Sequence, residues 1–397
     1  MSVEVNEFQR LCQMFPEWES LKTFLVNEAG LRIIVSEDAP GLAVVRYVKD
    51  KSKMDCESIN VSLFRSVVID TATTNVVCMA PPKSKSGLPP LLKPFTQIED
   101  FVDGCMVQAF MTSDGVLRLC TRTQIGAKNT FYSSKSFAAL FEECLACTPI
   151  RTLDSLKALM YERLNSLSAA AVFASFVIQH PEHRIVVKCR SPELTMVHFG
   201  WTTLEGLVTL EEDGSLWPTA LRCLEAPRYL PQGFTADGES QALVRTCSVS
   251  NGFCWQGLVF KDGTGSRWKL RSKSYLLLRG LRGGEAHPVE RFLRLRKSGK
   301  VIEYLKHYGE ERALFWEYEQ TLRAKTAEIL KAYESVNKTR TTTFAELDES
   351  CKPGVFMLHS HYLNVLRPEK KGSIRLNDAI TVVNSMKVFE QRRLIGV

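Results

Sequence analysis

The sequence predicts an α+β protein in which antiparallel strands come first and helices come last. Up to residue 284, short apolar runs alternate with turns rich in glycine, proline and aspartate, which is the spacing of β-hairpins. From residue 289 to 336 the chain is instead rich in Leu, Glu, Lys and Arg, with apolar residues at helical intervals. A length of 397 residues allows two domains. We therefore expect a strand-rich domain over 1–288 and a helical domain over 289–397.

The first part of the chain is expected to form short helices and then short strands. Apolar residues between positions 3 and 26 have helical spacing. Strand-like runs follow at 31–35, 42–48, 61–69 and 75–78, and the last two are expected to pair as a hairpin. Residues 80–94 hold five prolines, which exclude a helix or a central strand, so we expect an extended surface loop there.

The middle of the chain continues this pattern. The turn Ser113-Asp114-Gly115 predicts a hairpin whose second strand covers 116–121. Helices are expected after Ser136 and over 153–167, and a strand begins at 172. Residues 225–240 contain turn formers and are expected to be a loop. In the last domain, two or more helices are expected before 336, and Asn377 is expected to cap a final helix.

One hairpin carries a row of positive charge. The apolar runs 255–260 and 268–270 flank a short turn, and strand alternation places Arg267, Lys269 and Arg271 on one face. Residues 261–300 hold 12 Lys and Arg against three acids, within an overall net charge of +7. Such a row suits phosphate groups. It is equally typical of a solvated edge strand whose charges oppose aggregation, and this stretch alone favours that interpretation.

Four short motifs resemble those of one family. Gln256-Gly-Leu-Val and Lys269-Leu-Arg271 are similar to Glu-Gly-x-Val and Lys-x-Lys, the last two motifs of the adenylating RNA ligases, the covalent nucleotidyltransferases of phages and large DNA viruses. Phe101-Val-Asp103-Gly104 is similar to that family's Lys-x-Asp-Gly, and residues 176–187 resemble its Phe-Glu-x-x-x-Pro-x-x-Arg-Ile-Val. The resemblance implies an antiparallel-sheet nucleotidyltransferase fold, ATP-dependent RNA ligase-like, with a C-terminal helical domain.

The same resemblance assigns expected roles to individual residues. Arg65-Ser66 falls in an early Arg-Gly segment, and Arg122 falls where relatives contact the nucleotide. Phe199 and Trp201 lie where relatives stack an aromatic ring on adenine, although either ring could equally be core. The candidates for binding a nucleotide or phosphate are Asp103, Gly104, Arg122, Lys269 and Arg271.

Three positions depart from the family in ways that bear on catalysis. Phe101 replaces the lysine nucleophile, and Val177 and Gln256 replace carboxylates. Loss of a covalent nucleophile alone costs on the order of a millionfold in rate. We therefore predict a pseudoenzyme that is not catalytic, without cofactor or metal, in which Asp103 pairs with Lys269. The alternative is an active ligase with divergent motifs that uses ATP and Mg, with a lysine such as Lys93 as its nucleophile.

The remaining features bound the setting. No run is long and apolar enough to span a membrane, and the start of the chain does not resemble a signal peptide. The 12 cysteines are scattered, so Cys144 and Cys147 do not predict a zinc site, and His359 and His361 on one face of a strand are a weak metal signal. We expect a cytoplasmic location, or the virion if the origin is viral. RNA or the proteins of a large assembly are the expected partners, rather than a small-molecule substrate.

Overall fold

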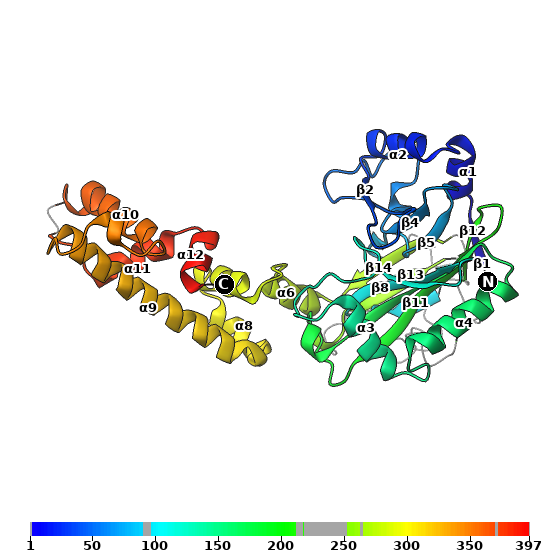
Figure 1. Ribbon diagram of the computed structural model, residues 1–397. Coiled ribbons are helices and arrows are strands. Elements are labelled where there is room, and N and C mark those ends of the chain that lie inside the picture. The colour runs from blue at the N-terminus through cyan, green and yellow to red at the C-terminus, as the bar shows by residue number, and fades with distance from the viewer. Residues whose placement is uncertain are drawn as a thin grey trace. The chain divides into compact units, whose positions relative to one another are not determined.

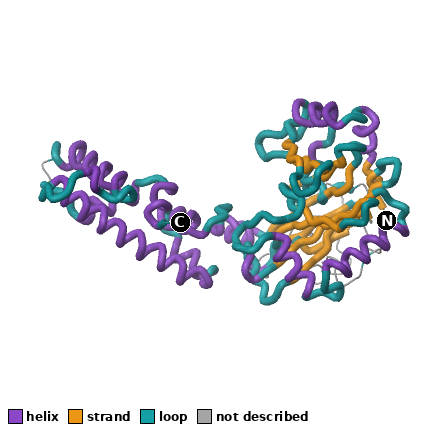
Figure 2. Tube along the Cα trace, viewed as in Figure 1, coloured by secondary structure: helices purple, strands orange, loops and turns teal. Residues whose placement is uncertain are grey.

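A computed structural model describes residues 2–89, 97–211, 217, 252–262, 265–369 and 372–396 (Figure 1). The chain divides into two compact units, residues 1–280 and residues 281–397. We call them the sheet unit and the helical unit. The boundary expected from composition, 288/289, falls inside the second of these. Figure 2 shows that the described strands belong to the sheet unit. Lys93 and the expected loop at 225–240 lie outside the described residues.

The largest sheet of the sheet unit has six antiparallel strands. Its centre is β10, which pairs with β8 on one side and β11 on the other. In spatial order the strands are β1 (Ser2–Val5), β12 (Val208–Glu211), β11 (Glu193–Thr202), β10 (Ala171–Gln179), β8 (Cys105–Thr112) and β9 (Leu117–Cys120). Strands β8 and β9 form the hairpin predicted around residues 113–115.

Two four-stranded sheets complete the unit. The second sheet is a simple antiparallel meander, and the third has one parallel edge, where β6 pairs with β14. The second contains β2 (Arg32–Val35), β3 (Leu42–Arg46), β4 (Val67–Asp70) and β5 (Val76–Met79). The third, in spatial order, contains β6 (Lys85–Ser86), β14 (Arg267–Arg271), β13 (Gly257–Lys261) and β7 (Gln97–Asp100).

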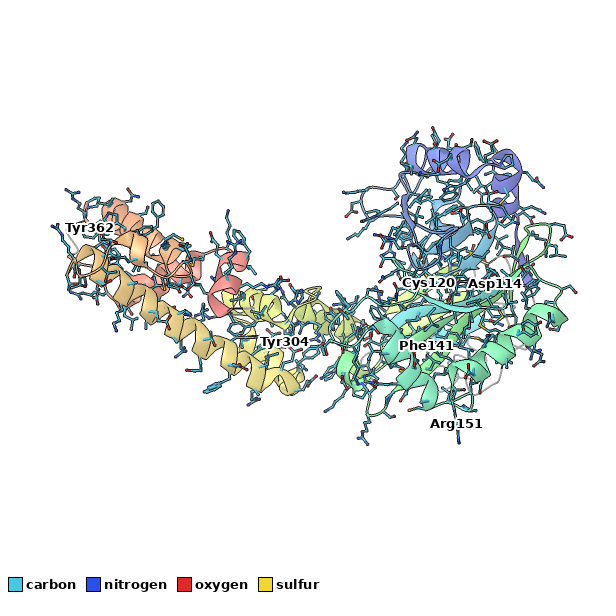
Figure 3. The ribbon with its side chains drawn as sticks, in the orientation of Figure 1. Asp114, Cys120, Phe141, Arg151, Tyr304 and Tyr362 are labelled. Atoms are coloured by element: carbon cyan, nitrogen blue, oxygen red, sulfur yellow. The ribbon has the colours of Figure 1, made fainter. Side chains whose placement is uncertain are left out.

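Two hydrophobic cores lie on opposite faces of the largest sheet, because successive side chains of a strand point to opposite sides. On β10, Phe173 joins the core shared with the second sheet, whereas Phe176 joins the core under α3 and α4. Phe141 of α3, which is labelled in Figure 3, packs edge-on against Phe176, with ring centroids 5.5 Å apart. The helices of this unit are α1 (Asn6–Met14), α2 (Trp18–Asn27), α3 (Phe137–Ala146), α4 (Leu153–Ser166) and α6 (Lys273–Arg282).

Two of the predicted strands are shorter than expected. The run 61–69 begins with a 3-10 turn at Val61–Leu63, so β4 starts only at Val67. The strand beginning near 172 ends at Gln179, because Pro181 starts another 3-10 turn and lacks the N–H that a strand would donate. The fold class itself is confirmed: antiparallel sheets are followed by C-terminal helices.

The helical unit corrects two further expectations. His359 and His361 lie in a helix, not a strand, and the cap of the helix after residue 375 is Arg375, so Asn377 lies within its first turn. None of the described helices is long and apolar enough to cross a bilayer. The helices are α7 (Pro288–Lys297), α8 (Val301–His307), α9 (Arg312–Asn337), α10 (Lys352–His361), α11 (Leu376–Ser385) and α12 (Val388–Ile395).

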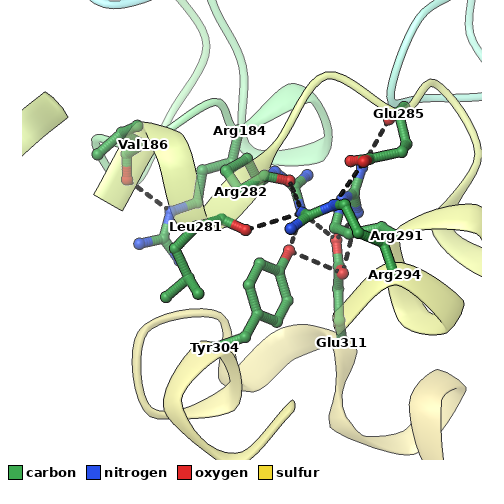
Figure 4. A network of polar contacts seen from close by, with 9 residues as sticks. All are labelled: Arg184, Val186, Leu281, Arg282, Glu285, Arg291, Arg294, Tyr304 and Glu311. Carbon is green, nitrogen blue, oxygen red and sulfur yellow. Dashed lines mark hydrogen bonds and ion pairs between the residues drawn. The ribbon is translucent and has the colours of Figure 1, made fainter. Parts of the chain in front are cut away.

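A buried ionic network holds α7, α8 and the start of α9 together. Arg282, Arg291 and Tyr304 converge on the carboxylate of Glu311 (Figure 4). The Nη1 atoms of Arg282 and Arg291 lie 2.5 Å and 2.7 Å from Oε1 of Glu311, and the Tyr304 hydroxyl donates to Oε2 at 2.9 Å. The Arg291 side chain is only 1% exposed. Much of the basic excess in residues 261–300 is therefore internal to this unit rather than displayed.

Candidate phosphate-binding site

The cationic row predicted on the β13–β14 hairpin is present in the sheet unit. The two strands pair antiparallel, with Gly257 opposite Arg271 and Lys261 opposite Arg267. Alternation along β14 puts Arg267, Lys269 and Arg271 on one face. Along this row burial decreases, because Arg267 is buried, Lys269 is half-buried and Arg271 is exposed. A solvated edge strand would expose all three, and β14 is an inner strand of its sheet.

Arg65 joins this row from the loop before β4. Burial lowers the pKa of Arg65 to about 10; Tyr47 acts in the opposite direction, and Arg267, Arg122 and Arg271 lower it further. Three cations from different parts of the chain are thus close enough to repel Arg65. The positive charge is concentrated at one place rather than spread over the surface.

Neighbouring cations act on Lys269 as well. Burial is the largest cause that lowers the pKa of its amine, followed by repulsion from Arg271, Arg65 and Lys83. We call the set Arg65, Lys83, Arg122, Lys269 and Arg271 the cationic cluster. Within the described part of the chain, no carboxylate forms an ion pair with any member of this cluster.

Arg122 is anchored by backbone carbonyls rather than by acids. Its Nε donates to the carbonyl of Arg65 at 3.2 Å and its Nη2 donates to the carbonyl of Tyr47 at 3.0 Å. The guanidinium also lies over the Tyr47 ring, 4.7 Å from the centroid. These contacts fix the side chain without neutralising it, which leaves its charge available to an anion.

A cavity of about 260 Å³ lies beside the cluster. Arg65, Arg122 and Gly104 line it, together with the polar side chains of Ser66 and Gln108. The Ser66 hydroxyl donates to Oε1 of Gln108 at 2.9 Å, which orients that amide on the floor formed by β8. The structure therefore brings the predicted residues Gly104 and Arg122 to one cavity.

Phe101 lies at the edge of the cationic row. Its ring is 5.0 Å from the guanidinium carbon of Arg271, a cation–π contact, and its N–H donates to the carbonyl of Gly257 at 2.9 Å. The segments around Phe101 and Arg271, which carry the first and last motifs, thus meet. An aromatic ring, not an amine, supports Arg271 there.

The predicted pairing of Asp103 with Lys269 is wrong. Oδ2 of Asp103 accepts from the backbone N–H groups of Val186 and Val187 at 3.0 Å and 2.8 Å, and Oδ1 accepts from the Tyr275 hydroxyl at 2.6 Å. Both oxygens of the Asp103 carboxylate are already hydrogen-bonded. Asp103 therefore ties three distant segments together and does not pair with Lys269.

Gly104 and Val177 are in close contact. A Cβ atom on Gly104 would lie 2.3 Å from the carbonyl oxygen of Ile178 and 2.6 Å from Cγ1 of Val177, so only glycine fits. Val177 is buried on β10 opposite Met106 of β8. Gln256 is also buried, and its Oε1 has no hydrogen-bond partner among the described residues.

Among the described residues, the candidate site has few groups that could bind a divalent cation. Two positions that would carry carboxylates hold Val177 and Gln256, and Asp103 is already engaged. Elsewhere in the described residues, Glu143, His180 and Glu182 lie close enough to share an ion, but Lys135 already pairs with both glutamates at 2.9 Å and 2.8 Å. The cluster fits phosphate oxygens and does not fit a metal held by the protein.

Sequence reasoning missed several residues of this site. Arg65 was noted only as part of a motif, and Tyr47 and Lys83 carry no motif; their roles depend on tertiary contacts. Phe199, by contrast, is core: its ring packs against Trp217, with centroids 5.3 Å apart, under α3 and α4. Trp201 packs against the same core and is partly buried.

Comparisons with known proteins find matches among solved structures. No family model matches the chain, and no curated protein matches it. Among solved structures, the chain is similar to two forms of an archaeal ATP-dependent RNA ligase. Form 2 has 14% identity and a TM-score of 0.41, over 77% of this chain and 76% of that one. Form 1 has 12% identity and a TM-score of 0.42, over 77% and 82%.

These matches contradict one prediction. The chain was expected not to be an enzyme, whereas the structures it is similar to are those of an ATP-dependent ligase. The prediction of a pseudoenzyme is wrong as stated. The argument for that prediction was incomplete, because replacement of the residues at three motif positions does not exclude catalysis by other groups of the same site. The similarity to RNA ligase structures agrees with the family that the motifs resemble. The phage or viral type is not shown.

Proposed function

We propose that the sheet unit binds RNA through its phosphate groups, at the cationic cluster, as part of an RNA ligase-like activity. The observation that carries this proposal is a group of five mutually repelling cations, two of which, Arg65 and Arg122, line one cavity, and none of which pairs with a carboxylate of the described residues. Half-buried cations that repel one another raise the free energy of the unliganded protein. An oxyanion bound among them would remove that repulsion.

The chemistry of the cluster suits phosphate better than carboxylate partners. Arg122 and Arg271 can each donate two parallel N–H groups to one phosphate, and Lys269 adds a point charge. The Tyr47 and Phe101 rings, which already support arginines, add flat surfaces beside the charges. Phosphates flanked by aromatic surfaces are the general pattern of single-stranded nucleic-acid binding.

The salt dependence of RNA binding tests this proposal. A fluorescent 12-nucleotide RNA with a 5′-phosphate would be titrated with the whole chain at several NaCl concentrations. Each phosphate contact on a single strand contributes about −0.7 to the slope of log K against log [salt]. We expect a slope of about −2 or steeper, and Lys269→Ala to make it less steep by about 0.7. Lys157→Ala, on exposed α4, is the matched control and should leave the slope unchanged. A slope near zero would contradict the proposal.

A second candidate function is nucleotidyl transfer from ATP, favoured by the state of Lys269. Its amine is half-buried among cations, and both conditions lower its pKa and increase the uncharged, nucleophilic fraction. The phosphates of ATP fit the cluster. Any divalent ion would have to enter with the nucleotide, since the described part of the cleft offers it no free carboxylate.

Covalent labelling separates this candidate from binding alone. The chain would be incubated with ATP labelled on its α-phosphate, and denatured protein would be resolved on a gel. Transfer predicts a labelled band that is stable in base and lost in acid, as expected for a phosphorus–nitrogen bond. Lys269→Arg keeps the charge and should abolish the band, whereas Lys83→Arg should keep it. An unlabelled wild-type chain that still binds RNA would eliminate transfer and leave the binding function intact.

A further inference from the structure

A second group of polar atoms lies buried on the inner face of the largest sheet. Ser175 of β10 and His198 of β11 are directly opposed partners in the ladder, so their side chains share one face. They are 0% and 5% exposed. Neither the Ser175 hydroxyl nor either ring nitrogen of His198 has a hydrogen-bond partner among the described residues.

The third sheet meets β11 beside His198: Lys261 of β13 donates to the carbonyl of Val197 at 3.4 Å, and Arg267 of β14 is the ladder partner of Lys261. Arg267 is buried, and its Nε also has no partner in the described part of the chain. Burial lowers the pKa of His198 well below its usual range, and Arg267 is the largest of the charges that lower it further, ahead of Lys261 and Arg65. Of these cations, Lys261 is neutralised by Glu99 at 2.6 Å. Arg267 and Arg65 form no ion pair with a carboxylate of the described residues.

This arrangement is costly without an occupant. Each buried donor without a partner destabilises a protein, and native structures contain few of them unless water or an ion is bound. Here the side chains of Ser175, His198 and Arg267 all contain such atoms, and the charges of Arg267 and Arg65 act on His198. An oxyanion would satisfy both the hydrogen bonds and the charge, whereas water would satisfy only the hydrogen bonds.

The group also borders the cavity of the cationic cluster. Ser175 is the ladder partner of Gln108, and Gln108 lines that cavity beside Arg65 and Ser66. A phosphate held at Ser175 and His198 would therefore lie next to one held by the cationic cluster. Two neighbouring phosphate positions match a nucleotide chain or the terminal phosphate of an RNA end.

We propose that Ser175, His198 and Arg267 form an interior phosphate site in which the hydroxyl, one ring N–H and the guanidinium each donate to the oxyanion. This inference deepens the proposed RNA-binding function, on which it rests for the identity of the ligand: the 5′-phosphate of an RNA end. The cationic cluster would then hold the phosphates that follow along the strand.

Thermal unfolding with inorganic phosphate tests the site directly. Phosphate should raise the melting temperature of the wild-type chain by several degrees beyond NaCl of equal ionic strength. Ser175→Ala and His198→Phe should each reduce that rise, and the part that remains is due to phosphate at the cationic cluster. Both variants should nevertheless be as stable as the wild type or more so without phosphate, because each removes an unsatisfied buried group. Ser20→Ala, exposed on α2, is the control and should keep the full response.

The opposite results would overturn the site. If phosphate acts no better than chloride, water satisfies these groups. If Ser175→Ala and His198→Phe both keep the full rise, phosphate binds elsewhere. Ser175→Ala is the milder change, so the test remains decisive even if His198→Phe fails to fold.

RNA with and without a 5′-phosphate separates this inference from the proposed function. The wild type should prefer the phosphorylated 12-mer by about tenfold, the value expected for hydrogen bonds to a charged group. Ser175→Ala should lose the preference, while Lys269→Ala should weaken both RNAs equally. If RNA binds with its expected salt slope but without a 5′ preference, the interior site is wrong and the RNA-binding function stands. If inorganic phosphate stabilises the wild type more than Ser175→Ala but no RNA binds, the interior site stands and the RNA-binding function fails.

Discussion

Asp103 is a structural residue that the family motif presents as a functional one. Its carboxylate accepts two backbone N–H groups and the hydroxyl of Tyr275, so it joins β8, the segment after β10 and α6. Burial, with the neighbouring Asp103 charge and its hydrogen bond, raises the pKa of Tyr275 well above its usual value. The hydroxyl therefore stays protonated and keeps donating.

Tyr275→Phe tests how much the hydrogen bond from Tyr275 to Asp103 stabilises the protein. The buried carboxylate would lose its shortest donor, and we expect the sheet unit to lose about 1–3 kcal/mol of unfolding free energy. Urea unfolding followed by circular dichroism measures it. Tyr161→Phe, a half-exposed tyrosine on α4, is the control and should change stability by less than about 0.5 kcal/mol. An unchanged midpoint for Tyr275→Phe would show that water replaces the hydroxyl.

Glu311 makes the helical unit sensitive to acid. Burial would raise the pKa of Glu311, but Arg282 and Arg291 more than offset it, so the pKa lies below the ordinary 4.5. A carboxylate with a lowered pKa stabilises the folded state above about pH 4.5, and that stabilisation is lost as the pH falls through the folded-state pKa. We expect the helical unit to lose stability below pH 4.5 for this reason.

Glu311→Gln should remove this dependence and destabilise at neutral pH. Arg282 and Arg291 would lose a charged partner in a buried setting, which costs about 3–5 kcal/mol. Unfolding curves at pH 7 and pH 4 would be compared with those of Glu317→Gln, an exposed position on α9. If Glu311→Gln retained the wild-type pH dependence, another acid would be responsible.

The sequence predicts individual residues only where their neighbours are local. Alternation along 267–271 was enough to place Lys269 and Arg271 on one face, because the period of a strand is fixed. The sequence could not show that Asp103 binds Tyr275, 172 residues away, nor that Arg65 joins the row. Ser175 and His198 carry no motif, and their lack of partners follows only from the packing of two sheets.

Gly257 controls the pairing of β13 with β14. Its φ is +142°, and an added Cβ would lie 1.9 Å from the carbonyl oxygen of Leu270 on the facing strand. The backbone cannot move away from such a contact unless the two strands separate. Gly257→Ala should therefore separate the hairpin, destabilise the sheet unit by more than about 3 kcal/mol and weaken RNA binding through the displaced Lys269.

A second glycine gives the matched comparison for Gly257→Ala. Gly280 lies in α6 with no atom within 4 Å of its added Cβ. Alanine is the better helix former, so Gly280→Ala should be neutral or stabilising by up to about 1 kcal/mol. Melting temperature and RNA affinity report both effects. Equal behaviour of the two variants would mean that the β13–β14 contact relaxes easily.

Strands and helices were predictable where the pattern was long. The run from 171 to 179 is buried on both faces because it is the central strand of the largest sheet. Its continuous apolar content predicted a strand. Histidines 359 and 361 show the limit of that approach. A short segment of mixed polarity fits a strand as well as a helix, and the packing of α10 against α9 decided the outcome.

The chain divides into two compact units, and we expect each to have its own stability. The change in composition near residue 289 indicated a second domain, although the boundary by contacts is at 280/281 because the sequence signal fades gradually along α6 and α7. The basic stretch 261–300 crosses this boundary. Its first part supplies the cationic row, and its later arginines are neutralised by Glu285, Glu311 and Glu319.

Calorimetry of the whole chain should therefore show two unfolding transitions. Tyr275→Phe should lower only the transition of the sheet unit, and Glu311→Gln only that of the helical unit, each by several degrees, because each residue's hydrogen bonds lie within one unit. Addition of the 5′-phosphorylated RNA should raise only the sheet-unit transition, since the ligand binds that folded unit alone. A single transition lowered by both variants would show that the two units unfold together, and that the cluster of charge in one is coupled to the ionic network in the other.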